Sequence, residues 1–214
     1  TENITVDKSL VIRSENGAGQ TLVQAAATNL DVFKVTTENV TIDGFTISGS
    51  TSKTGILLTR VTGQPSGNCT VTNNLCTNNN EGISILSSNN TIDNNTCTLS
   101  GSYGINLNNT TSNTVTGNTC SNINGSYAYA IYLADNADNN TVSGNTADSN
   151  SMGIRVKAAD NNTITANTLS NNTVGIELAT KPVGNVFYLN NFINNGTQVN
   201  EGFNGNTENS WNSS

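Results

Sequence analysis

The sequence predicts an all-β protein, a right-handed parallel β-helix built as a three-sided solenoid of about eight coils with about 22 residues per coil. Three observations carry this prediction. One asparagine-rich motif recurs along the chain. Its apolar stretches are short and alternate with period two, which indicates strands. Each repeat holds three such stretches, so each coil has three strands that stack on the next coil about 4.8 Å away.

The repeat consists of two consecutive signatures. The first copy begins at Cys69 and the last at Asn185, with starts 21 to 27 residues apart. The copies read CTVTNNLC, NTIDNNTC, NTVTGNTC, NTVSGNTA, NTITANTL and NVFYLNNF. A second signature, such as GISI at Gly82 or GINL at Gly104, accompanies each copy. Several successive copies at a nearly constant period are typical of a solenoid.

Aligned copies form columns of like residues. One apolar column is expected to line the core, and it comprises Ile56, Ile83, Ile105, Ile131, Ile154 and Ile176. A structural asparagine ladder is expected at the corner between the first two strands, because Asn tolerates left-handed backbone and stacked amides can bond to one another. It comprises Asn74, Asn95, Asn118, Asn145, Asn167 and Asn190. A partial second ladder comprises Asn79, Asn150, Asn172 and Asn195.

We interpret residues 1–214 as one domain. Residues 1–38 are expected to form an opening coil and cap, 39–200 the regular coils, and 201–214 a tail that partly caps the last coil, since the core of a solenoid must be closed at its ends. Gln64 to Gly67 and Asn122 to Tyr129 are insertions expected to loop out at corners. The abrupt start in a strand-like segment suggests a fragment of a longer secreted protein.

Composition excludes several classes of function. The chain has 41 Asn, 32 Thr and 21 Ser, a net charge of −7 and no His. An acidic chain without a basic stripe is unsuited to nucleic acid. No apolar run approaches the roughly 18 residues of a membrane span, so no membrane insertion is expected.

The pattern N-T-[IV]-x-x-N followed by G-I-x-[LV] resembles the NosD-like, or carbohydrate-binding and sugar-hydrolase, β-helix repeat, above all in the Asn- and Thr-rich surface proteins of archaea. The resemblance covers Ile4 to Trp211. It implies the β-helix fold and a secreted or cell-surface location. NosD proteins are associated with copper delivery, but this chain has no His and one methionine, Met152, so no copper role is expected from the resemblance.

Cysteines form the first candidate site. Cys76, Cys97 and Cys120 share one column and should stack on adjacent coils. They are interpreted as small apolar residues that stack in a structural column and fill the narrow core. A disulfide and a soft-metal site are the alternatives. Cys69 stands where other copies have Asn and is expected to be the most exposed of the four.

Carboxylates form the second candidate site. Asp135, Asp138 and Asp160 could hold Ca²⁺ through oxygen ligands, although an Asp in a turn more often caps its own backbone. Asp43 and Asp93 share an outward column about two coil spacings apart, roughly 10 Å, with no motif that supports catalysis.

Tyrosines form the third candidate site. Tyr103, Tyr127, Tyr129 and Tyr132 cluster near the second insertion, and the ring of Tyr132 is expected to face outward between two inward residues. Exposed Tyr beside Asn and Asp is typical of a carbohydrate-binding surface. Packing of the insertion against the coils is the alternative.

The sequence therefore predicts a non-enzymatic extracellular or cell-surface module with a structural or adhesive role, weak glycan binding and no cofactor. The alternative is a carbohydrate-active enzyme of the β-helix type, a polysaccharide lyase or a glycoside hydrolase. Expected partners are an extracellular glycan, another cell-surface protein, or a second copy that associates through the end coils, whose sheet edges are open.

Overall fold

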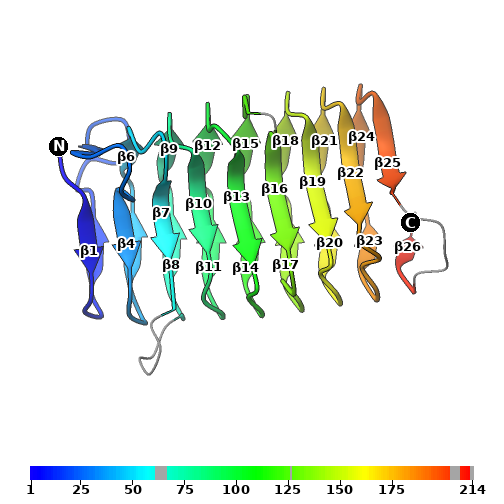
Figure 1. Ribbon diagram of the computed structural model, residues 1–214, viewed down its shortest axis with the longest axis horizontal. Coiled ribbons are helices and arrows are strands. Elements are labelled where there is room, and N and C mark those ends of the chain that lie inside the picture. The colour runs from blue at the N-terminus through cyan, green and yellow to red at the C-terminus, as the bar shows by residue number, and fades with distance from the viewer. Residues whose placement is uncertain (61–66, 126, 203–207, 213–214) are drawn as a thin grey trace.

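The computed structural model describes residues 1–60, 67–125, 127–202 and 208–212, which form 26 strands in three parallel sheets (Figure 1). Sheet A consists of β1 (Ile4–Val6), β4 (Phe33–Val35), β7 (Thr54–Leu58), β10 (Glu81–Ile85), β13 (Tyr103–Asn108), β16 (Tyr129–Ala134), β19 (Met152–Lys157), β22 (Val174–Ala179) and β25 (Thr197–Glu201). Sheet B consists of β2 (Val11–Arg13), β5 (Thr41–Asp43), β8 (Thr70–Thr72), β11 (Thr91–Asp93), β14 (Thr114–Thr116), β17 (Thr141–Ser143), β20 (Thr163–Thr165), β23 (Val186–Tyr188) and β26 (Ser210–Asn212). Sheet C consists of β3 (Leu22–Gln24), β6 (Thr46–Ser48), β9 (Leu75–Thr77), β12 (Thr96–Thr98), β15 (Thr119–Ser121), β18 (Thr146–Asp148), β21 (Thr168–Ser170) and β24 (Asn191–Ile193).

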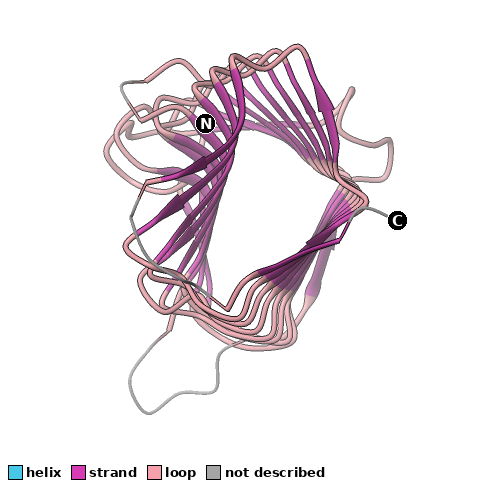
Figure 2. Cartoon of the chain, turned by 90° about the vertical axis from the view of Figure 1, so that its right-hand side faces the viewer, coloured by secondary structure: helices cyan, strands magenta, loops and turns pink. Residues whose placement is uncertain are grey.

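The predicted parallel β-helix is confirmed. Figure 2 shows its three flat sides, which meet at corners made of loops. Successive strands of each sheet pair in register, as in Ile83 with Ile105 and Ile92 with Val115. From Ile131 to Val199, paired residues are 22 or 23 positions apart in the sequence, close to the predicted period. About eight coils therefore stack into a rod roughly 40 Å long.

The core follows from the alternation of side chains along each strand. In sheets B and C the middle residue of nearly every three-residue strand points inward, as in Val71 of β8 and Cys76 of β9, both 0% exposed. In sheet A two inward residues per strand fill the wider side, as Ile105 and Leu107 do in β13. The interior is thus a stack of similar apolar layers, and each layer packs against the coils above and below it.

The corner between sheets B and C differs from our expectation in one detail. The left-handed residue is the one before each ladder asparagine, not the ladder asparagine itself. These residues are Asn73 (φ 55°), Asn94 (φ 53°), Gly117 (φ 63°), Gly144 (φ 63°), Ala166 (φ 53°) and Leu189 (φ 56°). Placing the bend one residue earlier turns the ladder side chain inward, where its amide can reach the neighbouring coils.

The glycine of the second signature lies against the next coil. A Cβ at Gly104 would lie 2.5 Å from the carbonyl oxygen of Ala130 and 3.0 Å from both Cβ and Sγ of Cys120. At Gly82 the corresponding contacts are 2.6 Å to the oxygen of Gly104 and 2.8 Å to Sγ of Cys97. Glycine is therefore needed here for close approach of the coils, which explains its recurrence.

The ends of the rod have their own features. The segment predicted as a tail contributes β26, and Trp211 stacks on Phe187 with ring centroids 4.1 Å apart and an interplanar angle of 13°. At the other end, β1, β2 and β3 form the first coil. Of the first predicted insertion, Gln64 to Ser66 lie outside the described residues. The second insertion follows β15, but its last residue, Tyr129, does not loop out and instead begins β16, and Ser126 lies outside the described residues.

Candidate functional site

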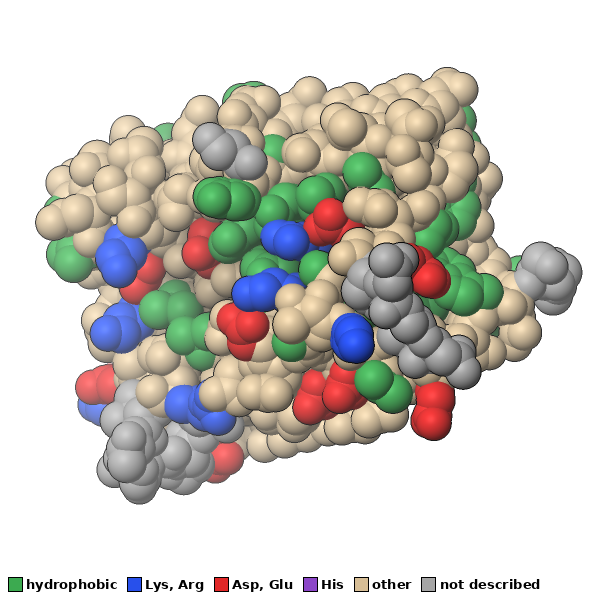
Figure 3. All heavy atoms as spheres, turned by 45° about the vertical axis from the view of Figure 1, so that its right-hand side comes forward, with side chains coloured by type: hydrophobic (Ala, Val, Ile, Leu, Met, Phe, Trp, Pro, Cys, Tyr) green, Lys and Arg blue, Asp and Glu red, His purple; other side chains and the backbone are tan. Residues whose placement is uncertain are grey.

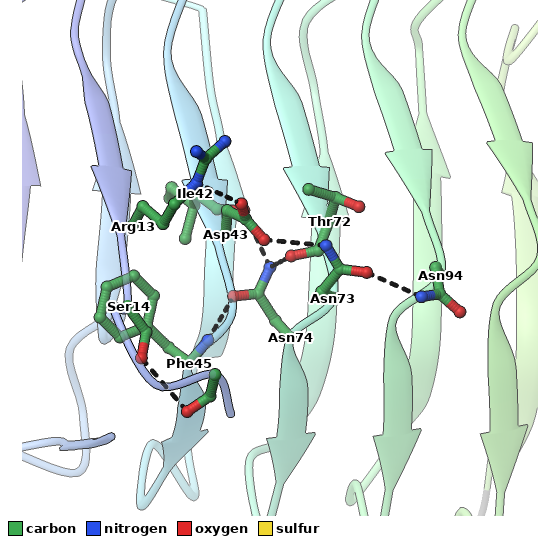
Figure 4. A network of polar contacts seen from close by, with 10 residues as sticks. Arg13, Ser14, Ile42, Asp43, Phe45, Thr72, Asn73, Asn74 and Asn94 are labelled. Carbon is green, nitrogen blue, oxygen red and sulfur yellow. Dashed lines mark hydrogen bonds and ion pairs between the residues drawn. The ribbon is translucent and has the colours of Figure 1, made fainter. Parts of the chain in front are cut away.

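The predicted asparagine column forms a continuous chain of hydrogen bonds. The side-chain Nδ2 of each of Asn74, Asn95, Asn118, Asn145 and Asn167 donates to Oδ1 of the next member at 2.9–3.0 Å. The backbone N–H of each also donates to that same oxygen. Figure 4 shows the start of the ladder, where Asn74 accepts from the N–H of Phe45 and donates to the carbonyl oxygens of Ile42 and Thr72. Each amide therefore joins three coils.

Figure 4 also shows a parallel chain on the outside of the same corner. The Asp43 carboxylate accepts from Arg13 at 2.6 Å and from the Asn73 amide at 2.9 Å. The Asn73 amide in turn accepts from Asn94 at 2.7 Å. Asp43 therefore has an ion pair and an amide as partners, and Asp93 lies two coils along the same column. This arrangement ties the coils together.

The second predicted ladder is present over its last three members, because Asn150, Asn172 and Asn195 are joined in the same way at 3.1 and 3.0 Å. Asn79 instead accepts from Ser50 and donates to Ile47. A third ladder, at the corner before sheet B, was missed. It comprises Asn90, Asn113, Asn140, Asn162, Asn185 and Asn209. The first Asn of the recurring N-T-[IV] was its signal.

The expectation that Cys69 is exposed is wrong. Its side chain is 2% exposed. Cys69 occupies the first position of the third ladder, where the backbone turns the side chain inward. Its N–H donates to Asn90 Oδ1 at 3.0 Å and its thiol to the carbonyl oxygen of Gly67 at 3.2 Å. Burial raises the pKa of this thiol.

The cysteine column lies inside the rod. Cys76, Cys97 and Cys120 are stacked in register on β9, β12 and β15, are 0% exposed and are free thiols. The hydrogen bond with Cys97, together with burial, raises the pKa of the Cys76 and Cys120 thiols well above the ordinary value. The raised pKa keeps the Cys76 and Cys120 thiols neutral, and the buried column packs as small apolar residues do.

The aspartates considered as calcium ligands bind backbone and lysine groups. Asp138 Oδ1 accepts from the N–H of Asp160 at 2.7 Å, and Asp160 Oδ1 accepts from the N–H of Val183 at 2.8 Å. Asp135 faces Lys157 at 3.4 Å. In the described part of the chain no three His, Cys, Asp or Glu side chains are grouped so that they could hold a metal ion. The carboxylates connect successive turns instead.

The tyrosines do meet, on the outer face of sheet A. Tyr103 stacks on Tyr129 with centroids 5.6 Å apart, and Tyr132 lies 5.2 Å from Tyr103 and 5.3 Å from Tyr129. Arg155 lies over the Tyr129 ring at 4.9 Å and donates to its hydroxyl at 2.7 Å. The Tyr132 side chain points away from the core as expected, but it is not exposed, because its neighbours leave it 8% exposed. Tyr127, at 62%, is the exposed ring of the cluster.

We expect alkali to destabilise the protein through this cluster. Desolvation by burial raises the pKa of Tyr103, Tyr129 and Tyr132. In the unfolded chain they ionise near pH 10. Their contribution to stability is therefore complete below about pH 10 and is lost as the pH rises from there through the folded-state pKa values. Urea unfolding between pH 8 and 11 should show a smaller alkaline loss for Tyr132→Phe than for wild type. Tyr127→Phe, at the exposed ring, is the matched control, and an equal effect of both variants would contradict this prediction.

A groove lies beside the cluster on the same face. It has a volume of about 350 Å³ and crosses the outer side of β7, β10 and β13. Its polar lining includes Asp31, Lys53, Asn80, Glu81, Asn106 and Asn108. Figure 3 shows charged and hydrophobic side chains interleaved on one side of the rod, next to a surface that is mainly uncharged and polar. The sequence alone did not indicate this groove.

The stacked sheets and the three ladders place the protein in the class of parallel β-helix proteins. Within that class it belongs to the NosD family, because residues 2–214 match the family described as "Periplasmic copper-binding protein (NosD)". A stretch of 74 residues is 39% identical to a "Cell surface glycoprotein" of Methanothermus fervidus. That match covers 35% of this chain but 11% of the relative, so the chain spans only a small part of the curated protein it matches.

Solved structures share the fold at low identity. XylC in its complex with xylose has a TM-score of 0.59 at 14% identity, over 76% of this chain and 35% of that one. The periplasmic alginate epimerase AlgG has a TM-score of 0.57 at 16% identity, over 89% and 46%. An alginate lyase from Paenibacillus sp. has a TM-score of 0.54 at 13% identity, over 95% and 90%. These likenesses establish the architecture alone.

The residues present do not fit a copper site of the kind that the family description implies. Copper in proteins takes imidazole, thiolate or thioether ligands. The chain has no His, and its four thiols are buried in the rod. Met152 packs against the tyrosine cluster.

Among the described residues there is no helix long and apolar enough to cross a membrane.

Proposed function

We propose that this chain is a passive, rigid structural module of a cell-surface protein. The observation that carries the proposal is the ladder system, in which buried amides such as Asn118, 1% exposed, join each coil to both neighbours. A rod built in this way keeps its length and shape under load, because bending it requires breaking in-register bonds on three sides. The similarity of part of the chain to a cell surface glycoprotein supports the location.

The carboxylates singled out in the sequence support a passive role over an enzymatic one. Of the carboxylates singled out in the sequence, Asp43, Asp135, Asp138 and Asp160 bind to backbone, amide, Lys or Arg groups. Glycoside cleavage needs two carboxyl groups about 5 to 10 Å apart on either side of the substrate. Asp43 and Asp93 share one column two coils apart, and Asp43 is engaged by Arg13. The enzymatic alternative remains open to direct test.

The test is incubation of the chain with plant, algal and archaeal polysaccharides. New reducing ends would report hydrolysis, and ultraviolet absorbance of unsaturated products would report lyase chemistry. We expect neither above the level of a heat-denatured sample. Turnover of any polymer would overturn the passive role. Labelling of the parent protein on intact cells by an antibody to this module would test the surface location, and absence of label on intact but not on lysed cells would refute it.

A further inference from the structure

The groove over β7, β10 and β13 contains polar atoms that the fold leaves unused, in contrast to the ladders. Asp31 Oδ1 accepts from the N–H of Thr54 at 3.1 Å, and Glu81 Oε2 accepts from Asn106 Nδ2 at 3.2 Å. The second oxygen of each carboxylate has no protein donor in the described chain. Lys53 is exposed and forms none of the ion pairs found among the described residues. The groove thus offers both acceptors and a donor.

Asn106 adds a second, independent observation. It is 7% exposed, and its Oδ1 is buried without a hydrogen-bond partner among the described residues. The bond from Nδ2 to the Glu81 carboxylate fixes which atom is the oxygen. An unpaired buried acceptor destabilises the folded state, and such atoms in a folded protein call for an explanation. Because Asn106 lines the groove, a ligand bound there can supply the missing donor.

One end of the groove adjoins the tyrosine cluster. Glu81 pairs with Tyr103 on the next strand, and Tyr103 stacks on Tyr129 of the strand after that. The half-buried Tyr103 ring therefore stands between the groove and the cluster, where it can contact the apolar face of a bound ring. Leu57 and Leu86 provide apolar lining on the coils before it.

The charge balance selects the kind of ligand. Two carboxylates and one ammonium give the groove a net negative charge, which disfavours uronates and other anionic polymers. The carboxylate and amide acceptors suit hydroxyl donors, and Lys53 suits a ring or hydroxyl oxygen. We propose that this groove binds a neutral glycan, with sugar hydroxyls donating to Glu81, Asp31 and Asn106 and with Tyr103 at its edge.

This binding is a property additional to the structural role, and its test is separate from that of the proposed function. The probes are xylotetraose, cellotetraose and mannotetraose as neutral glycans and trimannuronate as the anionic one, with binding followed by saturation-transfer difference NMR and calorimetry. We expect at least one neutral probe to bind and trimannuronate not to bind. Glu81→Gln and Lys53→Ala should each weaken binding about tenfold, the loss expected for a hydrogen bond to a charged group.

Matched controls lie on the same rod. Lys34→Ala, at an exposed lysine of β4 outside the groove, and Asp93→Asn, on β11 of sheet B, should leave binding unchanged. Unchanged unfolding midpoints for all four variants keep the comparison free of folding effects. The proposal is overturned if no neutral probe binds, if trimannuronate binds best, or if the control variants weaken binding as much as the groove variants. None of these results bears on the structural role.

Discussion

Replacing Asn118 with Ala is expected to destabilise the protein by roughly 3–5 kcal/mol, a large part of the stability of an ordinary domain. The amide donates to Ile92 O at 2.9 Å, Thr116 O at 2.9 Å and Asn145 Oδ1 at 3.0 Å, and it accepts two bonds from Asn95. Alanine would leave these partners buried without water, and each orphaned group costs about 1–3 kcal/mol. Urea denaturation followed by circular dichroism would measure the loss.

The matched control is Asn94→Gly, one coil earlier at the exposed position before the ladder. Its amide makes one exposed bond, to Asn73, and glycine keeps the left-handed backbone that Gly117 and Gly144 adopt at the same position. We expect a change within about 0.5 kcal/mol. A loss at Asn118→Ala no larger than that of the control would mean that the ladders do not stabilise the rod.

Gly104→Ala is the second substitution with a large expected effect, a loss of about 2–4 kcal/mol from overpacking. The new methyl group would lie 2.5 Å from the carbonyl oxygen of Ala130. That oxygen belongs to a paired strand, so it cannot withdraw without weakening sheet A. Gly19→Ala is the control, because nothing lies within 4 Å of the added Cβ there. Equal unfolding midpoints for both variants would contradict the close-packing argument.

A double substitution separates the two contacts that the methyl group makes. The added Cβ would also lie 3.0 Å from Sγ of Cys120. The one Ala in the glycine column, Ala130, occurs in the coil whose cysteine column holds Ala147. Cys120→Ala should therefore recover part of the loss in the Gly104→Ala background, while it destabilises the wild type through a small cavity. Additive losses in the double variant would show that the backbone contact alone matters.

Prediction from the sequence succeeded for residues that face the core and for the asparagine ladder between sheets B and C. Every coil must stack on the one before it, so these positions repeat, and columns such as the one that contains Ile105 are visible without any structure. The burial and backbone conformation of single positions were harder to predict from the sequence. Cys69 looked like the exposed start of a strand, yet it holds a ladder position that faces inward. The bend itself falls one residue before Asn118, at Gly117.

The sequence by itself determined the three-sided parallel solenoid, its period and the asparagine ladder between sheets B and C, because residues that stack on one another recur at the period of the coil. Only the tertiary structure decided what the outer face of sheet A presents. There Tyr132 is covered by its neighbours, and Asp31 comes to line one groove with Asn106, 75 positions later in the sequence. Outward side chains need not repeat, since solvent imposes no register on them. Their contacts follow from which coils become neighbours, and that is fixed only when the rod is assembled.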